Sequence, residues 1–230
     1  MCFGSALADV QRYARWLATA GVERGLLGPR EVDRLWQRHL LNSAALAPWL
    51  PARGSVLDLG SGAGLPGVVI ALLRPDLEVV LLEPLLRRAT FLTEVVADLQ
   101  LPRTEVVRAR AEDYATSNPE SVDAVVARAV APMGRLIGWA SPLITQGGFL
   151  LALKGETVSQ ELDAAEATRQ DWGMATAEVH PVATGTSLTQ VVSMRRVGPI
   201  TAAETAARSS GSAKPAHPAR QRDRAQRRKR

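Results

Sequence analysis

The chain has 230 residues, of which 46% are hydrophobic, so it can bury the core of one domain with terminal extensions. Its single cysteine, Cys2, excludes internal disulfide bonds and a cysteine-rich zinc site, as is typical of a reducing compartment. No apolar run is long enough to cross a membrane, and the N-terminus has neither the basic flank nor the apolar stretch of a signal peptide. We therefore expect a cytoplasmic protein without a membrane partner. The three histidines are far apart in the sequence, so no metal site is expected.

Helical periodicity characterises residues 1–50. Apolar residues recur at the spacing of one helix face within residues 5–20, and a second stripe predicts a helix over residues 29–49. Pro51 and Gly54 then interrupt the periodic pattern. We predict that residues 1–50 form a helical cap packed on the rest of the fold.

Strands and helices alternate over residues 51–200. This alternation predicts an α/β fold with a parallel sheet covered by helices on both faces. After Trp172 two adjacent strand patterns predict an antiparallel hairpin instead of a crossover. The prediction is a Rossmann-like domain whose mostly parallel, seven-stranded sheet ends in a hairpin. The expected strands are residues 55–59, 78–83, 104–108, 122–128, 147–153, 175–182 and 187–196, and the expected helices are residues 64–74, 85–99, 132–141 and 157–170.

A glycine-rich turn follows the first of these strands. Asp58 lies near the strand end, and Gly60, Gly62 and Gly64 follow at alternate positions, so no Cβ separates the turn from a ligand. The turn also fits the dinucleotide pattern G-x-G-x-x-G. However, an acid at the strand tip would repel a pyrophosphate, whereas S-adenosylmethionine (AdoMet) has an ammonium and a sulfonium group and no phosphate. The turn, together with the terminal hairpin, therefore favours AdoMet over a nicotinamide dinucleotide.

Five sequence segments occur in a fixed order between residues 38 and 155. They are RHLLNS at 38–43, DLGSGAGLPG at 58–67, RAE at 110–112, ARA at 127–129 and LKG at 153–155. Together they resemble the bacterial 16S ribosomal RNA guanine-N7 methyltransferases, the glucose-inhibited division protein B (RsmG) family. The resemblance implies a class I AdoMet-dependent methyltransferase that modifies N7 of a guanosine in 16S ribosomal RNA.

The chain departs from the family pattern in its N-terminal part. Asn42 stands where family members usually have an aspartate. Residues 22–27 replace the Trp-Asn and Asn-Leu-Thr segments that usually precede the second helix. Both departures lie in the predicted cap.

The resemblance also implies a set of AdoMet-binding residues. Turn residues would line the methionine and ribose, Glu83 would lie at the ribose end, and two residues after the third strand would border the adenine. A backbone N–H can meet a ring nitrogen of adenine while a carboxylate, of Glu112 or Asp113, accepts from the exocyclic amine. A structural salt bridge is the alternative for Arg128, and His39 is expected to pack or bond within its own helix. The implied residues are Gly60, Leu65, Glu83, Ala111, Glu112 and Arg128.

No catalytic residue is assigned. Methylation of an exocyclic amine usually uses an Asn/Asp-Pro-Pro-aromatic loop, and residues 128–132 have a different sequence. Methylation of a pyrimidine carbon needs a cysteine nucleophile, which Cys2 is poorly placed to provide. Guanine N7 has an in-plane lone pair, so alignment without a base suffices. The alternatives are a small-molecule methyltransferase and a non-catalytic, RNA-binding ribosome-assembly factor.

Positive charge is concentrated at the C-terminus. Residues 214–230 contain eight basic residues and one acid, so residues 1–213 have a net charge of about −2. Residues 201–230 lack apolar periodicity, and we expect them to be disordered. Their arginines, with Arg227 and Arg228 among them, are expected to bind RNA phosphates, and a solubilising end is the alternative.

Two further basic residues are candidates for RNA contact. Lys154 is the only lysine before the tail and ends the fifth predicted strand, where such sheets place ligands. Chance placement is an equal alternative for Lys154, and Arg38 is the second candidate. The expected partner is 16S ribosomal RNA, alone or within the 30S subunit or an assembly intermediate, bound by a monomer.

Overall fold

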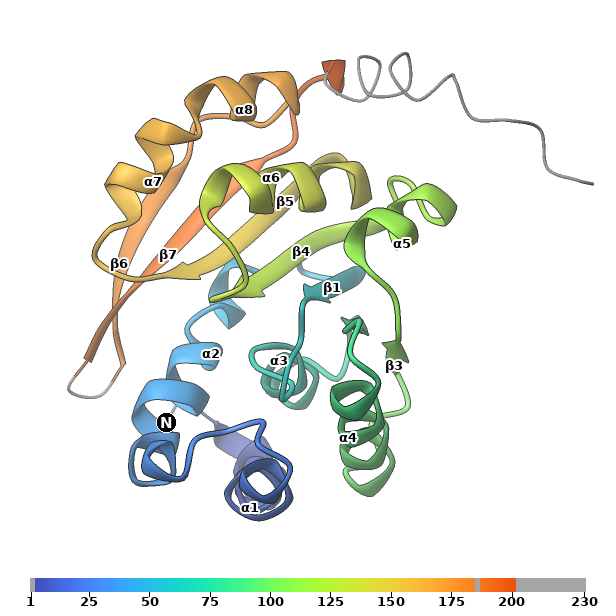
Figure 1. Cartoon of the computed structure of the whole chain (residues 1–230), viewed down its shortest axis with the longest axis vertical. Helices are drawn as coiled ribbons and strands as arrows, with labels where there is room; N and C mark the ends of the chain where they lie inside the picture. The colour runs from blue at the N-terminus through green and yellow to red at the C-terminus, as the bar shows by residue number, and fades with distance from the viewer. Residues whose placement is uncertain (1–2, 185–186, 202–230) are drawn as a thin grey trace, which may run out of the picture.

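A computed structural model describes residues 3–184 and 187–201 of the chain (Figure 1), so the expectations for Arg227, Arg228 and the tail lie outside the described residues. Seven strands form one sheet in the order β3-β2-β1-β4-β5-β7-β6. Strands β1 to β5 are parallel, and β7 runs antiparallel to both β5 and β6. The predicted parallel sheet with a terminal hairpin is confirmed. The strands are β1 Ser55–Leu59, β2 Glu78–Leu82, β3 Thr104–Val107, β4 Val122–Arg128, β5 Ile144–Lys154, β6 Glu178–Thr184 and β7 Ser187–Arg195.

Helices cover both faces of this sheet (Figure 1). Because side chains alternate along a strand, Val56 joins the core on one face while Leu57 joins the core on the other. The first face packs against α1 Leu7–Trp16, α2 Asn42–Ala44, α3 Gly67–Leu73 and α4 Leu86–Asp98. The second packs against α5 Ala111–Ser117, α6 Met133–Ala140 and α7 Val158–Ala164, and α8 Glu166–Asp171 packs on α6 and α7.

The N-terminal segment is part of the first core. Leu17 and Leu40 are fully buried in the same cluster as residues of β1 and β2. Helix α1 is also fixed to α4, because Arg12 and Trp16 both donate hydrogen bonds of 2.8 Å to Asp98. The segment therefore packs as a layer of the fold, and a domain division at residue 50 stays a prediction.

The single helix predicted over residues 29–49 is wrong. The chain instead forms a 3-10 helix at Pro29–Arg34, a π-helix at Leu35–Leu41, the short α2 and a second 3-10 helix at Ala47–Trp49. Pro48 cannot donate a helical hydrogen bond, which limits any regular helix at this end. Short π-helical turns occur frequently at functional sites, and His39 lies in this one.

Three other helices differ from expectation. Residues 111–117 form α5 where a loop was expected, and the acids in its first turn favour a helix start. The helix expected from residue 64 begins at Gly67, because Gly64 has a φ of +97°, outside helical geometry. The helix expected over residues 157–170 is divided into α7 and α8 at Ala165.

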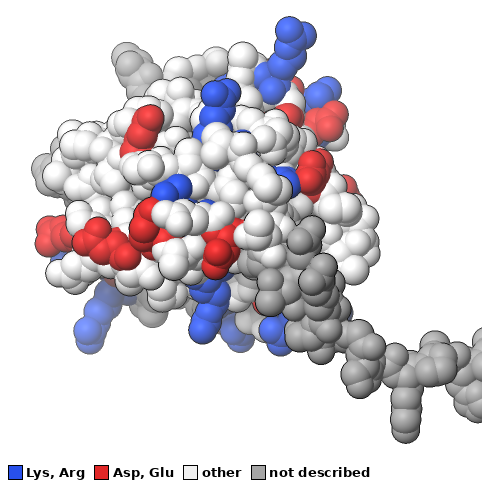
Figure 2. Space-filling view, turned by 90° about the horizontal axis from the view of Figure 1, so that it is seen from above, with Lys and Arg blue, Asp and Glu red and all other residues white. Residues whose placement is uncertain are grey.

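Charge on the described surface is mixed. Figure 2 shows carboxylates and arginines interleaved on one face, in keeping with the slightly negative charge of residues 1–213. Across residues 3–184 and 187–201, no helix has both the length and the apolar character needed to cross a membrane. The same residues contain no group of three or more His, Cys, Asp or Glu side chains that would hold a metal ion.

Candidate active site

A cleft of about 850 Å³ opens at the carboxyl ends of the central strands. Strand β1 pairs with β2 on one side and with β4 on the other, and ligands of doubly wound sheets bind at such a switch point. The segments that follow β1, β2, β3 and β4 form its walls, and the N-terminal segment closes one side with Leu26, Leu27 and His39.

The glycine turn forms the floor of this cleft. Gly60 and Gly62 have φ values of +72° and +60°, which other residues rarely adopt. The backbone N–H groups of Gly60 and Ser61 both donate to the carbonyl of Leu82, at 2.9 and 3.1 Å, so the turn is fixed to β2. A Cβ at Gly60 would approach Val130 to 3.2 Å. The turn thus keeps its backbone open toward the cleft.

Asp58 does not face the cleft. It is fully buried beneath the turn, where Oδ2 accepts a 2.9 Å hydrogen bond from the N–H of Gly67 and Oδ1 has no partner. Burial raises the pKa of this carboxyl to about 7. The expectation that Asp58 presents its charge to a ligand is therefore wrong. The alternation along β1 turns it toward the first core, and its role is to hold the start of α3.

Glu83 joins the glycine turn to the segment after β2. Its side chain is almost fully buried in the cleft wall. One carboxylate oxygen accepts from the N–H of Gly62 and the other from the N–H of Leu85, both at 2.9 Å. Each oxygen has a second lone pair for a ligand hydroxyl. The carboxylate can therefore support the turn and bind a ligand at the same time.

A smaller cavity of about 140 Å³ adjoins the main cleft and shares Gly60 and Val130 with it. Ala111 and Glu112, in the first turn of α5, lie in its wall beside Trp139. Glu112 accepts a 2.6 Å hydrogen bond from the Trp139 indole. The six residues predicted to bind AdoMet thus surround two adjoining cavities, while the role of each stays a prediction.

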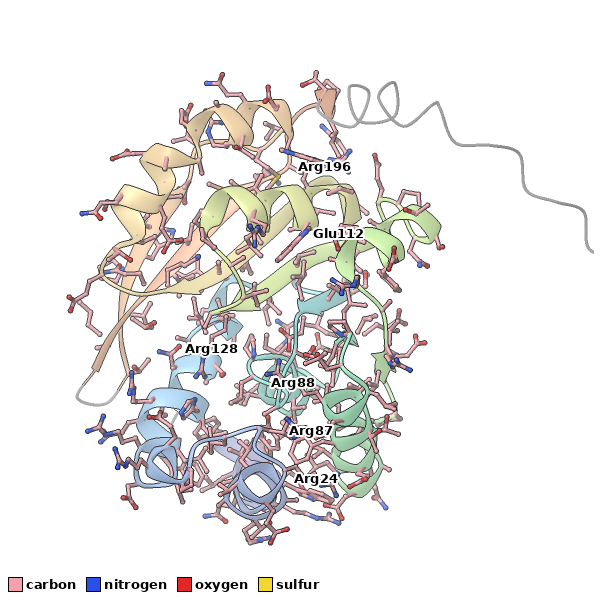
Figure 3. All side chains as sticks on the ribbon, viewed as in Figure 1. Arg24, Arg87, Arg88, Glu112, Arg128 and Arg196 are labelled. Carbon is pink, nitrogen blue, oxygen red and sulfur yellow. The ribbon has the colours of Figure 1, made fainter. Side chains whose placement is uncertain are left out.

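Arg128 binds a histidine instead of forming the salt bridge weighed above. Its guanidinium donates to the carbonyl and to Nδ1 of His39, and His39 Nε2 lies 2.9 Å from Glu31 (Figure 3 labels Arg128). Burial, reinforced by Arg128, lowers the pKa of His39, so the ring is neutral. The hydrogen bond from His39 lowers the pKa of Glu31. His39 is buried and bonds Glu31 of the same predicted helix, in line with expectation, whereas its contact with Arg128 was not expected.

A second cleft, of about 400 Å³, lies on the other side of this group. It shares His39, Arg128 and Ala129 with the main cleft, and the predicted RNA residues Arg38 and Lys154 also line it. Arg38 is more than half exposed, with Nη1 3.6 Å from Glu31. Arg38 and Lys154 thus line the same cleft, although Arg38 is exposed and the side chain of Lys154 is mostly buried.

Lys154 already has partners within the protein. Its side chain is 8% exposed, and Nζ donates to Glu161 and to the carbonyl of Ala131, both at 2.7 Å. Ala131 belongs to the segment that follows β4, and the N–H of Met133 also donates to Glu161. The geometry supports a structural role for Lys154, and contact with RNA stays a prediction.

The substitution Lys154→Met is expected to reduce the free energy of unfolding by about 2 kcal/mol, because the partly buried Glu161 loses its counter-charge and keeps only the N–H of Met133. Chemical denaturation measures this loss. The double variant Lys154→Met/Glu161→Leu should recover most of it. A large loss of RNA affinity with unchanged stability would instead favour the RNA contact.

Sequence reasoning missed several residues of the site. Leu26 and Leu27 come from the divergent segment, and Arg88 and Arg108 line the main cleft from α4 and from the end of β3 (Arg88 is labelled in Figure 3). Tyr13 is fully buried in α1 and donates a 2.7 Å hydrogen bond to the carbonyl of Ala63 in the glycine turn. Helical periodicity marks Tyr13 only as a core position and does not reveal this bond.

The substitution Tyr13→Phe is expected to reduce the free energy of unfolding by about 1–2 kcal/mol, because the partly buried carbonyl of Ala63 loses its donor. Urea denaturation at neutral pH measures the change. Tyr114→Phe, in the other tyrosine of the chain, is the control and should change stability by less than about 0.5 kcal/mol. Equal losses in the two variants would contradict a specific role for the Tyr13 hydroxyl.

Comparison with known proteins agrees with this architecture. A family model described as rRNA small subunit methyltransferase G matches residues 6–189. The ribosomal RNA small subunit methyltransferase G of Thermobifida fusca is 50% identical over 218 residues, which cover 94% of this chain and 90% of that protein. The protein of the same name from Streptomyces coelicolor is 56% identical over 171 residues, which cover 74% of this chain and 71% of that protein.

Solved structures confirm the fold class. TYW2 of M. jannaschii, determined in complex with AdoMet, superposes with a TM-score of 0.56 at 15% identity, covering 70% of this chain and 76% of that one. The precorrin-6y C5,15-methyltransferase of Geobacter metallireducens superposes with a TM-score of 0.51 at 16% identity, covering 74% of this chain and 90% of that one. The class I methyltransferase fold is thus shown, and the match over most of the sequence shows that the chain belongs to the rRNA small subunit methyltransferase G family.

Proposed function

We propose that this protein transfers a methyl group from AdoMet to N7 of a guanosine in 16S ribosomal RNA. The observation that supports the proposal most is the pair of adjoining cavities at the carboxyl ends of β1 and β2, floored by the glycine turn. The family of the chain and the names of its relatives add the substrate class. Because its substrate is ribosomal RNA, the enzyme acts in the cytoplasm.

The residues of the two cavities fit AdoMet. The open backbone of residues 60–62 suits the methionine part, and Glu83 retains lone pairs for the ribose hydroxyls. The small cavity beside Ala111 and Glu112 has the mixed apolar and polar wall that an adenine requires. Leu65 and Arg128 complete the predicted set on the main cleft.

Arginines at the rim suit the RNA. AdoMet has no phosphate, yet Arg88, Arg108 and Arg110 all line the main cleft. Arg108 and Arg110 are exposed, and neither forms an ion pair with another residue of the described ranges. Guanidinium groups bind phosphates through paired N–H donors. We therefore assign Arg108 and Arg110 to the sugar–phosphate backbone around the target base.

The reaction requires alignment of guanine N7 with the methyl group of AdoMet. AdoMet, when bound, supplies an electrophilic methyl group. Guanine N7 has a free lone pair and no proton to lose, so the protein needs no general base. Its residues hold the base in line, and a neutral His39 adds no positive charge beside a ring that becomes cationic.

Incubation of the purified protein with methyl-labelled AdoMet and unmodified 16S RNA, naked and in 30S particles, tests the proposal. Label in 7-methylguanosine is the expected result. Label in another nucleoside would contradict the assigned atom. Binding of AdoMet without transfer to either RNA would favour a small-molecule methyltransferase or a non-catalytic RNA-binding factor.

A further inference from the structure

The second cleft is placed to receive a substrate base. Its volume of about 400 Å³ lies within the range of small-ligand sites, about 300–1,000 Å³. It shares His39, Arg128 and Ala129 with the main cleft, so the two clefts adjoin at the end of β4. Leu153 and Leu188 provide apolar wall, and the remaining lining is mostly polar.

A chain of three side chains fixes the polarity of this cleft. Because the Arg128 guanidinium only donates, His39 Nδ1 is the acceptor of their hydrogen bond. The proton of the neutral ring is therefore on Nε2, which donates to Glu31 Oε2 at 2.9 Å. In this row of three side chains, Arg128 is the donor at one end and Glu31 is the acceptor at the other end. The imidazole ring of His39 lies between them.

Guanine has the complementary pattern. Its O6 and N7 accept hydrogen bonds, whereas its N1–H and N2 amine donate them, and a carboxylate accepts from both donors. Adenine presents an acceptor at N1 and a donor at N6, so it would oppose both ends of the chain. Asn42 adds polar capacity to the same wall, because its Oδ1 is buried with no hydrogen-bond partner among residues 3–184 and 187–201, and the amide can rotate to present either edge.

We propose that the second cleft binds the extruded target guanine, with Glu31 accepting from its N1–H and N2 amine and Arg128 donating to O6, so that N7 faces the glycine-turn cleft. This inference rests on the proposed function. Enzymes that act on a base commonly move it out of the stack into such a pocket. Glu31 becomes the residue that specifies guanine, and His39 positions both ends of the chain.

The same contact assists the reaction. Bond formation at N7 makes the guanine ring cationic, which makes N1–H a stronger donor. The hydrogen bond to the Glu31 carboxylate is therefore stronger in the transition state than in the bound substrate, and such differential binding lowers the barrier. The substitution Glu31→Gln should reduce kcat as well as kcat/KM.

The test pairs a protein change with a substrate change. The RNA is 16S RNA in the form that the labelling experiment identifies as substrate, with the modified guanosine kept or replaced by inosine, which lacks only the N2 amine. We expect inosine to reduce kcat/KM of the wild-type protein roughly 10-fold. Glu31→Gln should reduce kcat/KM on guanosine by about 100-fold, because a donor then faces a donor. The variant should show no further loss with inosine and should bind AdoMet with wild-type affinity.

The matched control is Glu23→Gln, an exposed glutamate in the same N-terminal segment, which should retain wild-type kinetics and the full inosine penalty. The inference is overturned if inosine is methylated as well as guanosine by the wild-type protein. It is also overturned if Glu31→Gln retains the 10-fold inosine penalty, because a purely structural role leaves the two changes independent. Absence of 7-methylguanosine with the wild-type protein would instead contradict the proposed function.

Discussion

Replacing Glu83 with alanine is expected to weaken AdoMet binding by about 100-fold. The carboxylate accepts the N–H groups of Gly62 and Leu85 from within the cleft wall. Hydrogen bonds to a charged group contribute about 1.5–3 kcal/mol each. The substitution therefore releases the glycine turn and removes the acceptor proposed for the ribose. Isothermal titration calorimetry measures the affinity, and circular dichroism confirms that the variant is folded.

Glu78→Ala is the matched control, because Glu78 begins the strand that Glu83 follows. Its side chain is 66% exposed and pairs with the exposed Arg103, so AdoMet affinity should change by less than about twofold. A folded Glu83→Ala protein that binds AdoMet as tightly as the wild type would contradict the assigned role. Equal losses in both variants would point to a general loss of stability instead.

The second large effect concerns Asp58 and pH. Burial raises the pKa of Asp58 to about 7 in the folded protein, whereas an unfolded chain has an aspartate pKa of about 3.9. Between these values the folded state retains a proton that the unfolded state has lost, so stability decreases as the pH rises through this window and levels off above about pH 7. A shift of about three units corresponds to about 4 kcal/mol.

The variant Asp58→Asn should lack this dependence. An asparagine oxygen can still accept from the N–H of Gly67, and the amide does not titrate. The difference in unfolding free energy between wild type and variant should therefore shift by about 4 kcal/mol in favour of the variant from pH 4 to pH 8. Urea denaturation at both pH values measures it, and the other carboxyl groups cancel in the comparison. Parallel pH profiles would show that Asp58 titrates normally.

Strand positions could be predicted from the sequence because both faces of the sheet are covered. The apolar runs around Val56, Val80 and Val125 are bounded by turn residues, and all three are strands. The secondary-structure predictions were wrong where tertiary contacts outweigh the local hydrophobic pattern. The pattern of residues 29–49 predicts one amphipathic helix, yet they form short 3-10, π and α segments, and His39 among them contacts Arg128, 89 residues away in the chain.

The part of the candidate site that lies at the strand ends could be predicted, because the carboxyl ends of parallel strands meet at one edge of the sheet. Glu83 and Arg128 follow neighbouring strands, so both had to lie at the same edge of the sheet. The direction of Asp58 was misjudged, because motif reasoning treated it as a ligand contact when its alternation with Leu57 and Leu59 turns it toward the first core. Tyr13 was missed, since no local pattern connects α1 with the glycine turn.

The shared core of the N-terminal segment has a consequence for synthesis of the protein. Leu17 and Leu40 pack in one cluster with Val95 and Val191, which are translated much later. The apolar face of the segment therefore has no cover while it leaves the ribosome, and it gains its partners only after β1, α3 and α4 have emerged. Non-local packing of this kind slows folding and lengthens the exposure of apolar surface. The N-terminal segment is thus among the last parts of this chain to reach its final environment, and its arrival adds the Tyr13 hydroxyl to the hydrogen bonds that hold the glycine turn.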